Sequence, residues 1–381
     1  MNTDTQTPVQ VKSAQLSPPA LRQMAFVDYP QVQRLEAGQL KSTSPTEEWR
    51  GLFLDNPAWA RVGKEWPIGW VLENEAGDVV GSITSFPSIY RFRGQDLICA
   101  NGRAWVCAPE YRGYAPWLME EFFNQPRVDL CISTTANANA EPICRTFATR
   151  VPVGDWESAA YWITGYRGFA RMALQKLGIP LAGALALPAS AALWLKDTVL
   201  VRTLPAFSSG VEIATSDTFD SRFEVFWEEL VRQNPNKVLA ARDRGTLTWH
   251  FAIAMRRTRL WIVTAVRNGL LRAYCILKRP GGENGVRRMR LIDYQTVETD
   301  TDLLPGILRV VLQHCAAEDL YVLEHVGRGL PKMQAIDQFA HRRKLPNWKF
   351  YYHAANPALH AELSKPEVWD PSQFDGDASI G

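Results

Sequence analysis

The chain has 381 residues, a length that accommodates two ordinary domains. Hydrophobic residues make up 46% and charged residues 22%, a balance that is typical of a globular protein and excludes a disordered one. The formal net charge of +2 gives no strong overall field toward a polyanion, so we expect no nucleic-acid partner.

The N-terminal stretch from Met1 to Ser17 is polar and lacks the apolar core of a secretory signal, so we expect a disordered tail over residues 1–20. The six cysteines include no CxxC pair and the six histidines are scattered, so we expect no metal site. Several cysteines lie in apolar stretches, as buried thiols of a reducing compartment do, and we expect a cytoplasmic protein.

The first half of the chain predicts antiparallel strands followed by a strand–helix–strand–helix unit, an α+β arrangement around one sheet. A hairpin turn is expected at Asn74-Glu75-Ala76-Gly77-Asp78. The predicted helices are Glu47–Phe53, Pro116–Phe123 and Glu141–Ala148. The predicted strands are Gly69–Glu73, Val79–Phe86, Ile89–Ile98, Ala104–Cys107 and Val128–Ser133.

The second half repeats the order hairpin, strand, helix, strand, which indicates an internal duplication. Its predicted helices are Phe223–Asn234, Arg244–Ala254 and Leu304–Ala317. Its predicted strands are Leu260–Val266, Leu271–Leu277, Met289–Tyr294 and Leu320–Leu323.

Between the halves, Leu177–Leu195 carries no charged residue over nearly a membrane-spanning length. Pro180 and Pro188 interrupt it, and it is rich in Ala and Gly. We therefore expect a pair of short helices that links two domains, and docking on a membrane surface stays open as the alternative.

The most informative stretch begins at Ala104, where an apolar strand, a sharp turn and a helix follow one another directly. Backbone N–H groups at a helix start, together with the helix dipole, form a pocket for a phosphate or diphosphate. The residues from Val106 to Gly113 read Val-Cys-Ala-Pro-Glu-Tyr-Arg-Gly. This segment resembles the acyl-coenzyme A-binding core of the GNAT acyltransferase superfamily, with Arg112 at the first position of the superfamily's signature.

The resemblance implies a fold of two tandem GNAT-like domains, each a mixed, mostly antiparallel sheet flanked by helices. We expect an N-terminal domain over 21–170 that carries the acyl-CoA loop, an apolar helical linker over 171–200, and a degenerate C-terminal domain over 201–381. The residues that the resemblance assigns to acyl-CoA are Val106, Cys107, Arg112, Gly113, Tyr114, Ala115 and Asn137.

The signature departs from the superfamily at its small residues, which let the chain approach phosphates. Ala115 replaces the first Gly, and Trp117 stands where a final Gly or Ala is usual. Pro116 removes one N–H donor from the phosphate cradle. The chain also resembles bacterial tandem-GNAT proteins that end, as here, in Trp369-Asp370-Pro371-Ser372 and Asp375-Gly376-Asp377.

The superfamily's next motif is matched by Asn137 and Ala140, and its Tyr, which protonates the departing thiolate, falls on Cys144. Cys144 is thus a candidate proton donor, with a small residue on a helix face as the alternative. Three carboxylates are candidate general bases, each with a structural alternative. They are Glu110, Glu141 and Asp129. The structural alternative for Glu110 is an exposed charge on a loop, for Glu141 a favourable interaction with the helix dipole, and for Asp129 a solvated residue at the end of a strand.

The corresponding loop of the second half, Gln295–Asp302, has no Arg-Gly turn and carries three acidic residues. These would repel a pyrophosphate, so we expect no acyl-CoA there, with helix capping by Asp300 or Asp302 as the main role.

The resemblance implies an acyl-CoA-dependent N-acyltransferase, with acetyl-CoA as the expected donor and a small-molecule or peptide amine of unknown identity as acceptor. The amine would attack directly, because proximity supplies most of the rate in such transfers. The alternative is a GNAT-fold binding or scaffold protein that has lost the chemistry. The sequence leaves the oligomeric state open.

Overall fold

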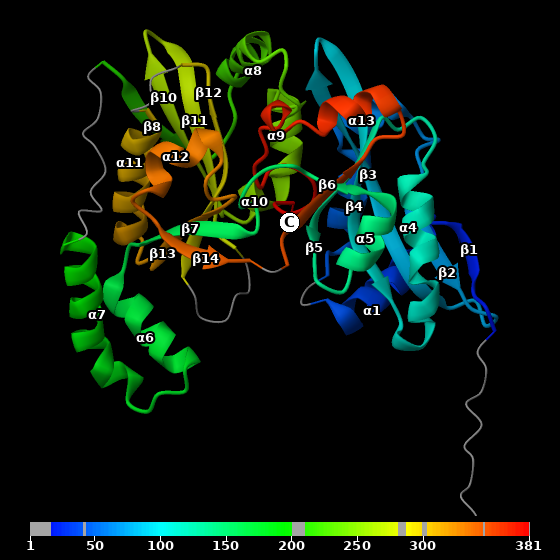
Figure 1. The fold of residues 1–381 in the computed structure, drawn as a ribbon, viewed down its shortest axis with the longest axis horizontal. Helices are drawn as coiled ribbons and strands as arrows, with labels where there is room; N and C mark the ends of the chain where they lie inside the picture. Colours follow the sequence, from blue (N-terminus) through cyan, green and yellow to red (C-terminus); the bar gives the residue numbers. More distant parts are fainter. Residues whose placement is uncertain are drawn as a thin grey trace, which may run out of the picture.

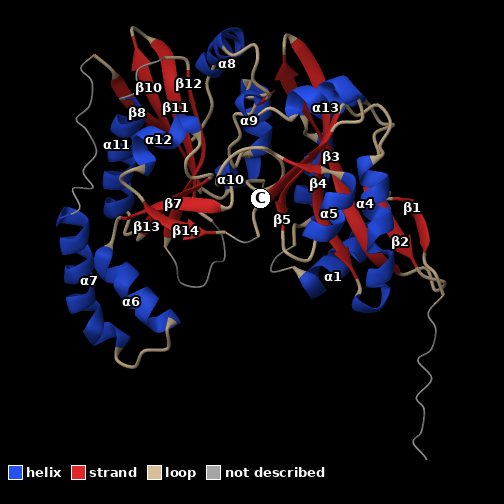
Figure 2. Ribbon diagram, in the orientation of Figure 1, coloured by secondary structure: helices blue, strands red, loops and turns tan. Residues whose placement is uncertain are grey.

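Two mixed β-sheets organise the residues that the computed structural model describes, which are 17–40, 43–199, 210–280, 287–298, 303–345 and 347–380 (Figures 1 and 2). The N-terminal sheet has the order β1 (Ala20–Gln23), β2 (Gly69–Glu73), β3 (Val79–Phe92), β4 (Gln95–Cys107), β5 (Leu130–Ala136), β15 (Lys349–His353) and β6 (Thr149–Arg150), and β9 (Leu239–Ala240) pairs with β3. The C-terminal sheet has the order β14 (His341–Lys344), β7 (Ser158–Ile163), β13 (Val322–Val326), β12 (Arg288–Thr296), β11 (Leu270–Lys278), β10 (Leu260–Arg267) and β8 (Glu212–Ser216).

The two sheets share one plan. Along each ordered path one neighbouring pair is parallel, β4 with β5 and β12 with β13, and the other neighbours are antiparallel. This arrangement agrees with the expected α+β fold class and with the expected duplication. A helix connects the strands of each parallel pair, α4 (Ala115–Phe123) in the first sheet and α11 (Leu303–Ala317) in the second.

Each sheet includes strands from the other half of the chain, and β9 of the expected second domain pairs with β3 of the N-terminal sheet. Strand β7 lies within the expected first domain, 21–170, yet pairs with β13 and β14 of the C-terminal sheet. Strand β15 lies within the expected second domain, 201–381, yet pairs with β5 and β6 of the N-terminal sheet. Sheet membership therefore crosses the expected boundaries, because strand pairing is set by long-range burial rather than by position in the chain.

The expected strand Ile89–Ile98 is wrong, because the chain reverses within it. Strands β3 and β4 form a long hairpin closed by Arg93 and Gly94, whose φ angles are +50° and +76°. Positive φ at both central residues gives the turn that matches the twist of a two-residue hairpin. The Arg-Gly pair is a weaker signal for this turn than Asn-Gly, and the apolar residues on both sides of it masked the reversal.

The remaining helices cover the sheets, and the expected helices at 47–53, 116–123, 141–148, 223–234 and 304–317 are present with small changes of boundary. The expected helix Arg244–Ala254 is interrupted at Phe251. Helix α8 buries Phe223, Phe226 and Leu230, which share one face at helical spacing. The helix bounds are α1 (Tyr29–Gln39), α2 (Thr46–Leu54), α3 (Pro57–Val62), α5 (Glu141–Phe147), α8 (Arg222–Gln233), α9 (Arg244–His250), α10 (Ala252–Arg256), α12 (Gln334–Asp337) and α13 (Pro357–Leu363).

The expected pair of short helices within Leu177–Leu195 is wrong, because this stretch forms a turn and the single helix α7 (Ala182–Val199), which continues through Pro188. Its antiparallel partner, α6 (Tyr166–Lys176), precedes the stretch. These helices leave β7 and precede β8, and both strands belong to the C-terminal sheet. The pair is therefore an excursion from one sheet rather than a connection between two sheets. Among the described residues no helix combines the length and apolarity needed to cross a membrane.

The C-terminal segment, Ser372–Ile380, lies between the two sheets (Figure 1). Its residues bind both of them. Ser372 donates to Asp293 of β12 at 2.7 Å, and Asp375 accepts from the hydroxyl of Tyr90 on β3 at 2.8 Å. At the other end of the chain, most of the expected disordered tail 1–20 lies outside the described residues, and Ala20 already begins β1.

Candidate functional site

Strands β4 and β5 separate in the middle of the N-terminal sheet. Their parallel register runs from Cys99 opposite Leu130 to Asn101 opposite Ile132, and it ends there. Just beyond this point Ala104 has a φ of +51°, and the β3–β4 register shifts by one residue. A bulge of this kind leaves one residue out of the ladder and turns the backbone locally. The strands therefore open a gap bordered by irregular backbone.

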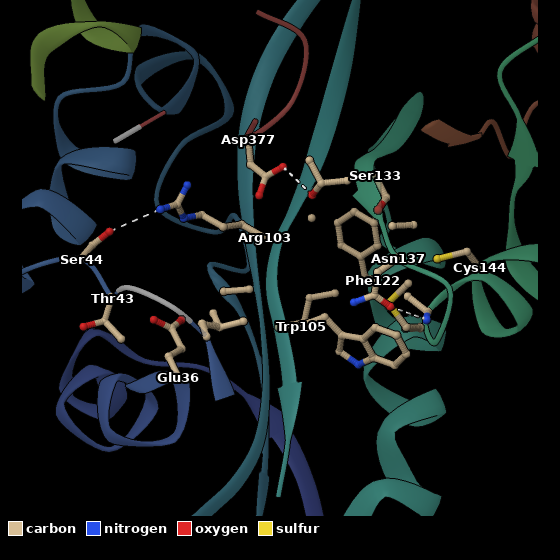
Figure 3. Close-up of a pocket in the computed structure, with 18 residues that line it drawn as sticks. Glu36, Thr43, Ser44, Arg103, Trp105, Phe122, Ser133, Asn137, Cys144 and Asp377 are labelled. Atoms are coloured by element: carbon tan, nitrogen blue, oxygen red, sulfur yellow. Dashed lines mark hydrogen bonds between the residues drawn. The ribbon is translucent and has the colours of Figure 1, made fainter. Parts of the chain in front are cut away.

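A cavity of about 310 Å³ occupies this gap. Figure 3 shows Phe122, Asn137 and Cys144 on the β5 side of β4, with Glu36 and Arg103 on the side of helix α1. Its lining residues are Glu36, Leu40, Thr43, Ser44, Ile83, Gly102, Arg103, Ala104, Trp105, Met119, Phe122, Ser133, Thr135, Ala136, Asn137, Ala140, Cys144 and Asp377.

A second hollow, a groove of about 440 Å³, lies at the start of α4 and shares Trp105, Asn137 and Ala140 with the cavity. The two hollows therefore adjoin at these three residues, so one elongated ligand could extend from the groove into the cavity. The groove is lined by Gln39, Trp105, Val106, Cys107, Arg112, Ala115, Asn137, Asn139, Ala140 and Ile143.

Five of the seven residues expected to bind acyl-CoA line this groove, and they are Val106, Cys107, Arg112, Ala115 and Asn137. The other two, Gly113 and Tyr114, belong to the adjoining 3₁₀ turn Pro109–Tyr114 and are not part of the lining. Asn137 also holds its own loop, because its side-chain oxygen accepts from the N–H groups of Asn139 and Ala140 at 2.9 and 3.0 Å.

Trp117 does not obstruct the groove, although it replaces a small residue of the signature. Its side chain is 38% exposed and packs edge-on against Tyr114, with ring centroids 5.0 Å apart. The N–H group of Ala115 donates to the carbonyl oxygen of Arg112 and so is already engaged within the chain. Since Pro116 has no N–H, the backbone offers fewer donors here than a glycine-rich loop would.

Of the candidate catalytic residues, Cys144 lines the cavity, and burial raises the pKa of its thiol to about 11. The candidate bases do not line either hollow. Glu110 is exposed on the 3₁₀ turn. Glu141 forms ion pairs with Arg145 and Lys349. Asp129 accepts from the N–H of Ile98 at 2.8 Å and holds the end of β5 against β4.

Three charged residues that the sequence did not single out lie in the cavity wall: Glu36, Arg103 and Asp377. Burial raises the pKa of Glu36 to about 7, although Arg103 opposes the shift. Burial also raises the pKa of Asp377, although the positive charge of Arg103 opposes this shift as well. Arg103 itself donates to Ser44 at 3.3 Å and to the carbonyl of Ile380 at 3.4 Å.

Asp377 comes from the C-terminal segment and accepts hydrogen bonds from Thr134 and Thr135 of β5, at 3.2 and 3.5 Å. The residue before it, Gly376, has a φ of +73°, and a Cβ there would lie 2.6 Å from the Cγ2 atom of Thr134. Only glycine allows this close approach in a left-handed conformation. The Asp-Gly-Asp ending was the one sequence signal that could have pointed to the site.

In the second half, the strands β12 and β13 also part, beyond Arg290 and Glu324. Glu298 of the expected acidic loop is paired with Arg267 at 2.7 Å and with Arg272 at 3.0 Å, so this carboxylate is neutralised. The expected capping residues Asp300 and Asp302 lie outside the described residues.

No family model matches the sequence, and no curated protein matches it. Several solved structures do resemble the chain. A GCN5-related N-acetyltransferase from Anabaena variabilis has a TM-score of 0.53 at 12% identity, over 88% of this chain and 73% of that one. A tandem GNAT protein of the clavulanic acid biosynthesis pathway has a TM-score of 0.50 at 12% identity, over 89% of this chain and 99% of that one.

The N-myristoyltransferase of Saccharomyces cerevisiae, solved with bound myristoyl-CoA, has a TM-score of 0.51 at 11% identity, over 92% of this chain and 81% of that one. At such identities the likeness shows the fold. The chain has the tandem GNAT fold, and the expected fold class is confirmed.

Proposed function

We propose that the chain is an acyl-CoA-dependent N-acyltransferase. The observation that carries the proposal is the junction of the two hollows, where the groove at the start of α4 meets the cavity between β4 and β5. The groove suits the diphosphate and pantetheine of acyl-CoA, and the cavity suits a short acyl group, so we propose acetyl-CoA as the donor. The three solved structures of similar fold are described as an N-acetyltransferase, a tandem GNAT protein and an N-myristoyltransferase, which supports acyl transfer as the reaction class.

The side chain of Arg112 carries much of the proposed recognition of the diphosphate. This loop offers fewer free backbone N–H groups to a diphosphate, because Pro116 has none and the N–H of Ala115 already donates to Arg112. A guanidinium can replace them, because its planar array of donors binds phosphate oxygens through charge-assisted hydrogen bonds. The positive end of the α4 dipole adds to this attraction.

The bulge at Ala104 provides the proposed site for the thioester carbonyl. The register shift takes Ala104 and Trp105 out of step with β3, so that both lie opposite Ile83. Backbone N–H groups released from a ladder can donate to the carbonyl oxygen, where negative charge develops as an amine attacks. These donors are preorganised, since the strand on either side of the bulge is fixed in the sheet.

We assign Asp377 as the general base. Its carboxylate would accept a proton from the attacking amine as the C–N bond forms and the C–S bond breaks, which leaves the thiolate of coenzyme A. Burial raises its pKa, which makes it a better proton acceptor than an exposed carboxylate. Glu36 in the same wall is the competing candidate.

Cys144 is the proposed hydrogen-bond donor to the departing thiolate. With a pKa of about 11 its thiol stays protonated at neutral pH, so it serves as a donor and not as a nucleophile. The described cysteines are all buried and unlinked, which supports the proposed cytoplasmic location.

Calorimetry of the full chain with acetyl-CoA tests the first step, and release of free thiol in the presence of a panel of small-molecule and peptide amines tests the second. We expect binding and, with the correct amine, thiol release. A folded protein that gives no heat with acetyl-CoA would overturn the proposal. Binding without transfer to any amine in the panel would favour the alternative, a degenerate binding protein.

A further inference from the structure

The helical pair α6–α7 carries most of the exposed large apolar side chains of the described structure. Leu181, at the turn between the two helices, is 79% exposed, and Leu177 beside it is 74% exposed. The other exposed large apolar residues of the described structure are Val27, Leu40, Leu54, Trp117, Val225 and Leu270, of which Val225 and Leu270 line one hollow. The exposed apolar side chains of the pair are Leu177, Leu181, Leu185, Leu187, Trp194, Leu195 and Val199.

Helix α7 is apolar on nearly every face. It buries a narrow stripe that includes Ala182, Ala186 and Ser190, spaced four residues apart along one side. The faces outside this stripe are also apolar, and Leu187 and Trp194, seven residues apart, share one of them at 64% and 56% exposure. Contiguous exposed apolar surface of this kind marks a site that contacts another apolar phase.

The pair projects away from both sheets (Figure 1) and is held firmly at its base. Asp197 near the end of α7 binds His341 of β14 at 3.0 Å and accepts from the hydroxyl of Tyr166 at 2.9 Å. Gly168 of α6 lies against the ring of Tyr321, where a Cβ would come within 2.2 Å of a ring carbon. The apolar surface is therefore presented on a fixed support.

The same helical pair carries exposed basic side chains. Residues 166–199 include Arg167, Arg171, Lys176 and Lys196, none of which has an ion-pair partner among the described residues. Asp197 is the single acidic residue of the segment, and it faces His341. The strand β14, which starts at His341, continues along the edge of the sheet to the exposed Lys344, while Arg342 and Arg343 are paired with Asp155 and Glu324.

We propose that the α6–α7 pair docks the protein on the surface of an anionic lipid bilayer. Apolar side chains that enter the headgroup boundary, with Lys and Arg beside them, are the combination that binds peripheral proteins to such surfaces. The low net charge of the whole chain does not oppose this, because attraction of this kind is local and decays within a Debye length. The proposal does not depend on the acyltransferase assignment.

A second copy of the chain is a less suitable occupant. Two pairs packed through their apolar faces would bring both sets of basic residues together, and like charges at a shared interface are unfavourable. An anionic lipid surface satisfies the apolar and the basic side chains at once.

Co-sedimentation of the full chain with vesicles tests the proposal. We expect the protein to sediment with vesicles of mixed phosphatidylcholine and phosphatidylglycerol, to sediment less at high salt, and to sediment little with phosphatidylcholine alone. The double variant Leu187→Glu with Trp194→Glu should weaken binding about ten-fold or more, because two apolar side chains are lost from the contact. The matched control Val225→Glu, 59% exposed on the distant helix α8, should bind like the wild type.

A fluorescent label reports the contact directly. The six native cysteines are buried, so a Leu187→Cys variant can be labelled selectively with a polarity-sensitive dye. We expect a blue shift with the mixed vesicles and none from the same dye on Val225→Cys. The proposal is overturned if the wild type does not bind the mixed vesicles, or if the double variant binds them unchanged. It is also overturned if light scattering shows self-association that the double variant abolishes, without vesicle binding.

Discussion

The carboxylate of Asp377 accepts a hydrogen bond from the hydroxyl of Thr134 at 3.2 Å, although 243 residues separate them in the chain. Through this contact the segment Ser372–Ile380 becomes part of a cavity wall in the first sheet. The neighbouring contacts of Ser379, with His250 at 2.6 Å and with Lys278 at 2.7 Å, tie the same segment to the second half. The cavity is therefore complete only when both halves are folded and joined.

Asp377→Asn should lower kcat about 10²-fold or more with little change in acetyl-CoA affinity, because a positioned general base contributes that much to proton transfer. The variant keeps the size of the side chain and one oxygen that can accept from Thr134 and Thr135, so the fold should persist. Steady-state kinetics with an accepted amine give the measurement. Asp370→Asn, which removes a carboxylate paired with Lys332 outside the cavity lining, is the control. Equal activity of Asp377→Asn and wild type would remove Asp377 from the mechanism.

Glu36→Gln should stabilise the protein at alkaline pH and leave its stability unchanged at pH 4. The pKa of Glu36 is about 7 in the folded state and near 4.3 in the unfolded state. Because the folded pKa is the higher one, the contribution to stability is present below pH 4 and is lost as pH rises through 7. The variant does not ionise, so it should gain on the order of 3–4 kcal/mol over the wild type at pH 8. Urea unfolding at both pH values measures this, and an equal difference at the two would contradict the expectation.

Arg112→Ala should weaken acetyl-CoA binding roughly ten-fold, which corresponds to one charge-assisted hydrogen bond. The loss should shrink at high salt, since the side chain is exposed and screened. Calorimetry of both proteins gives the ratio. Arg61→Ala, which removes an exposed guanidinium from helix α3, should bind like the wild type. An unchanged affinity in Arg112→Ala would exclude the groove as the diphosphate site.

Arg242→Met should destabilise the protein by about 3–5 kcal/mol, because it leaves a buried carboxylate without its partner. The guanidinium binds Asp293 at 2.8 Å, and both side chains are at most 1% exposed. Although burial opposes ionisation, Arg242 holds the pKa of Asp293 at about 2. The double variant Arg242→Met with Asp293→Leu should recover part of the loss, and Arg232→Met on the exposed face of α8 should cost little. Chemical denaturation measures all three.

Cys144→Ala should lower kcat roughly ten-fold, the effect of one lost hydrogen bond to the departing thiolate. Cys144→Ser should retain most of the activity, because a hydroxyl also donates. Thiol release under saturating acetyl-CoA separates this effect from binding. Full activity of the alanine variant would support the alternative that Cys144 only fills a helix face.

Much of the fold followed from local patterns. The strand, turn and helix from Val106 to Phe123 could be predicted because their apolar spacing and turn residues lie within a short window. Several residues that line the groove belong to that window and to the Asn137 loop, whereas Gln39 comes from helix α1 and Ile143 from helix α5. The hairpin at Arg93–Gly94 was missed because its turn lacks a strong residue signal and the apolar character continues through it.

The sequence by itself determined the repeated order of elements, which rests on periodicity. The motif that begins at Val106 carried the resemblance to the GNAT superfamily, and that resemblance implied the tandem fold and five of the ten residues that line the groove. The exchange of β7 and β15 between the sheets, and the placement of Asp377 and Glu36 around one cavity, were decided by tertiary structure. The physical reason is that strand partners and cavity walls are chosen by the burial of surfaces from distant parts of the chain, and no local pattern records which distant surface will be buried.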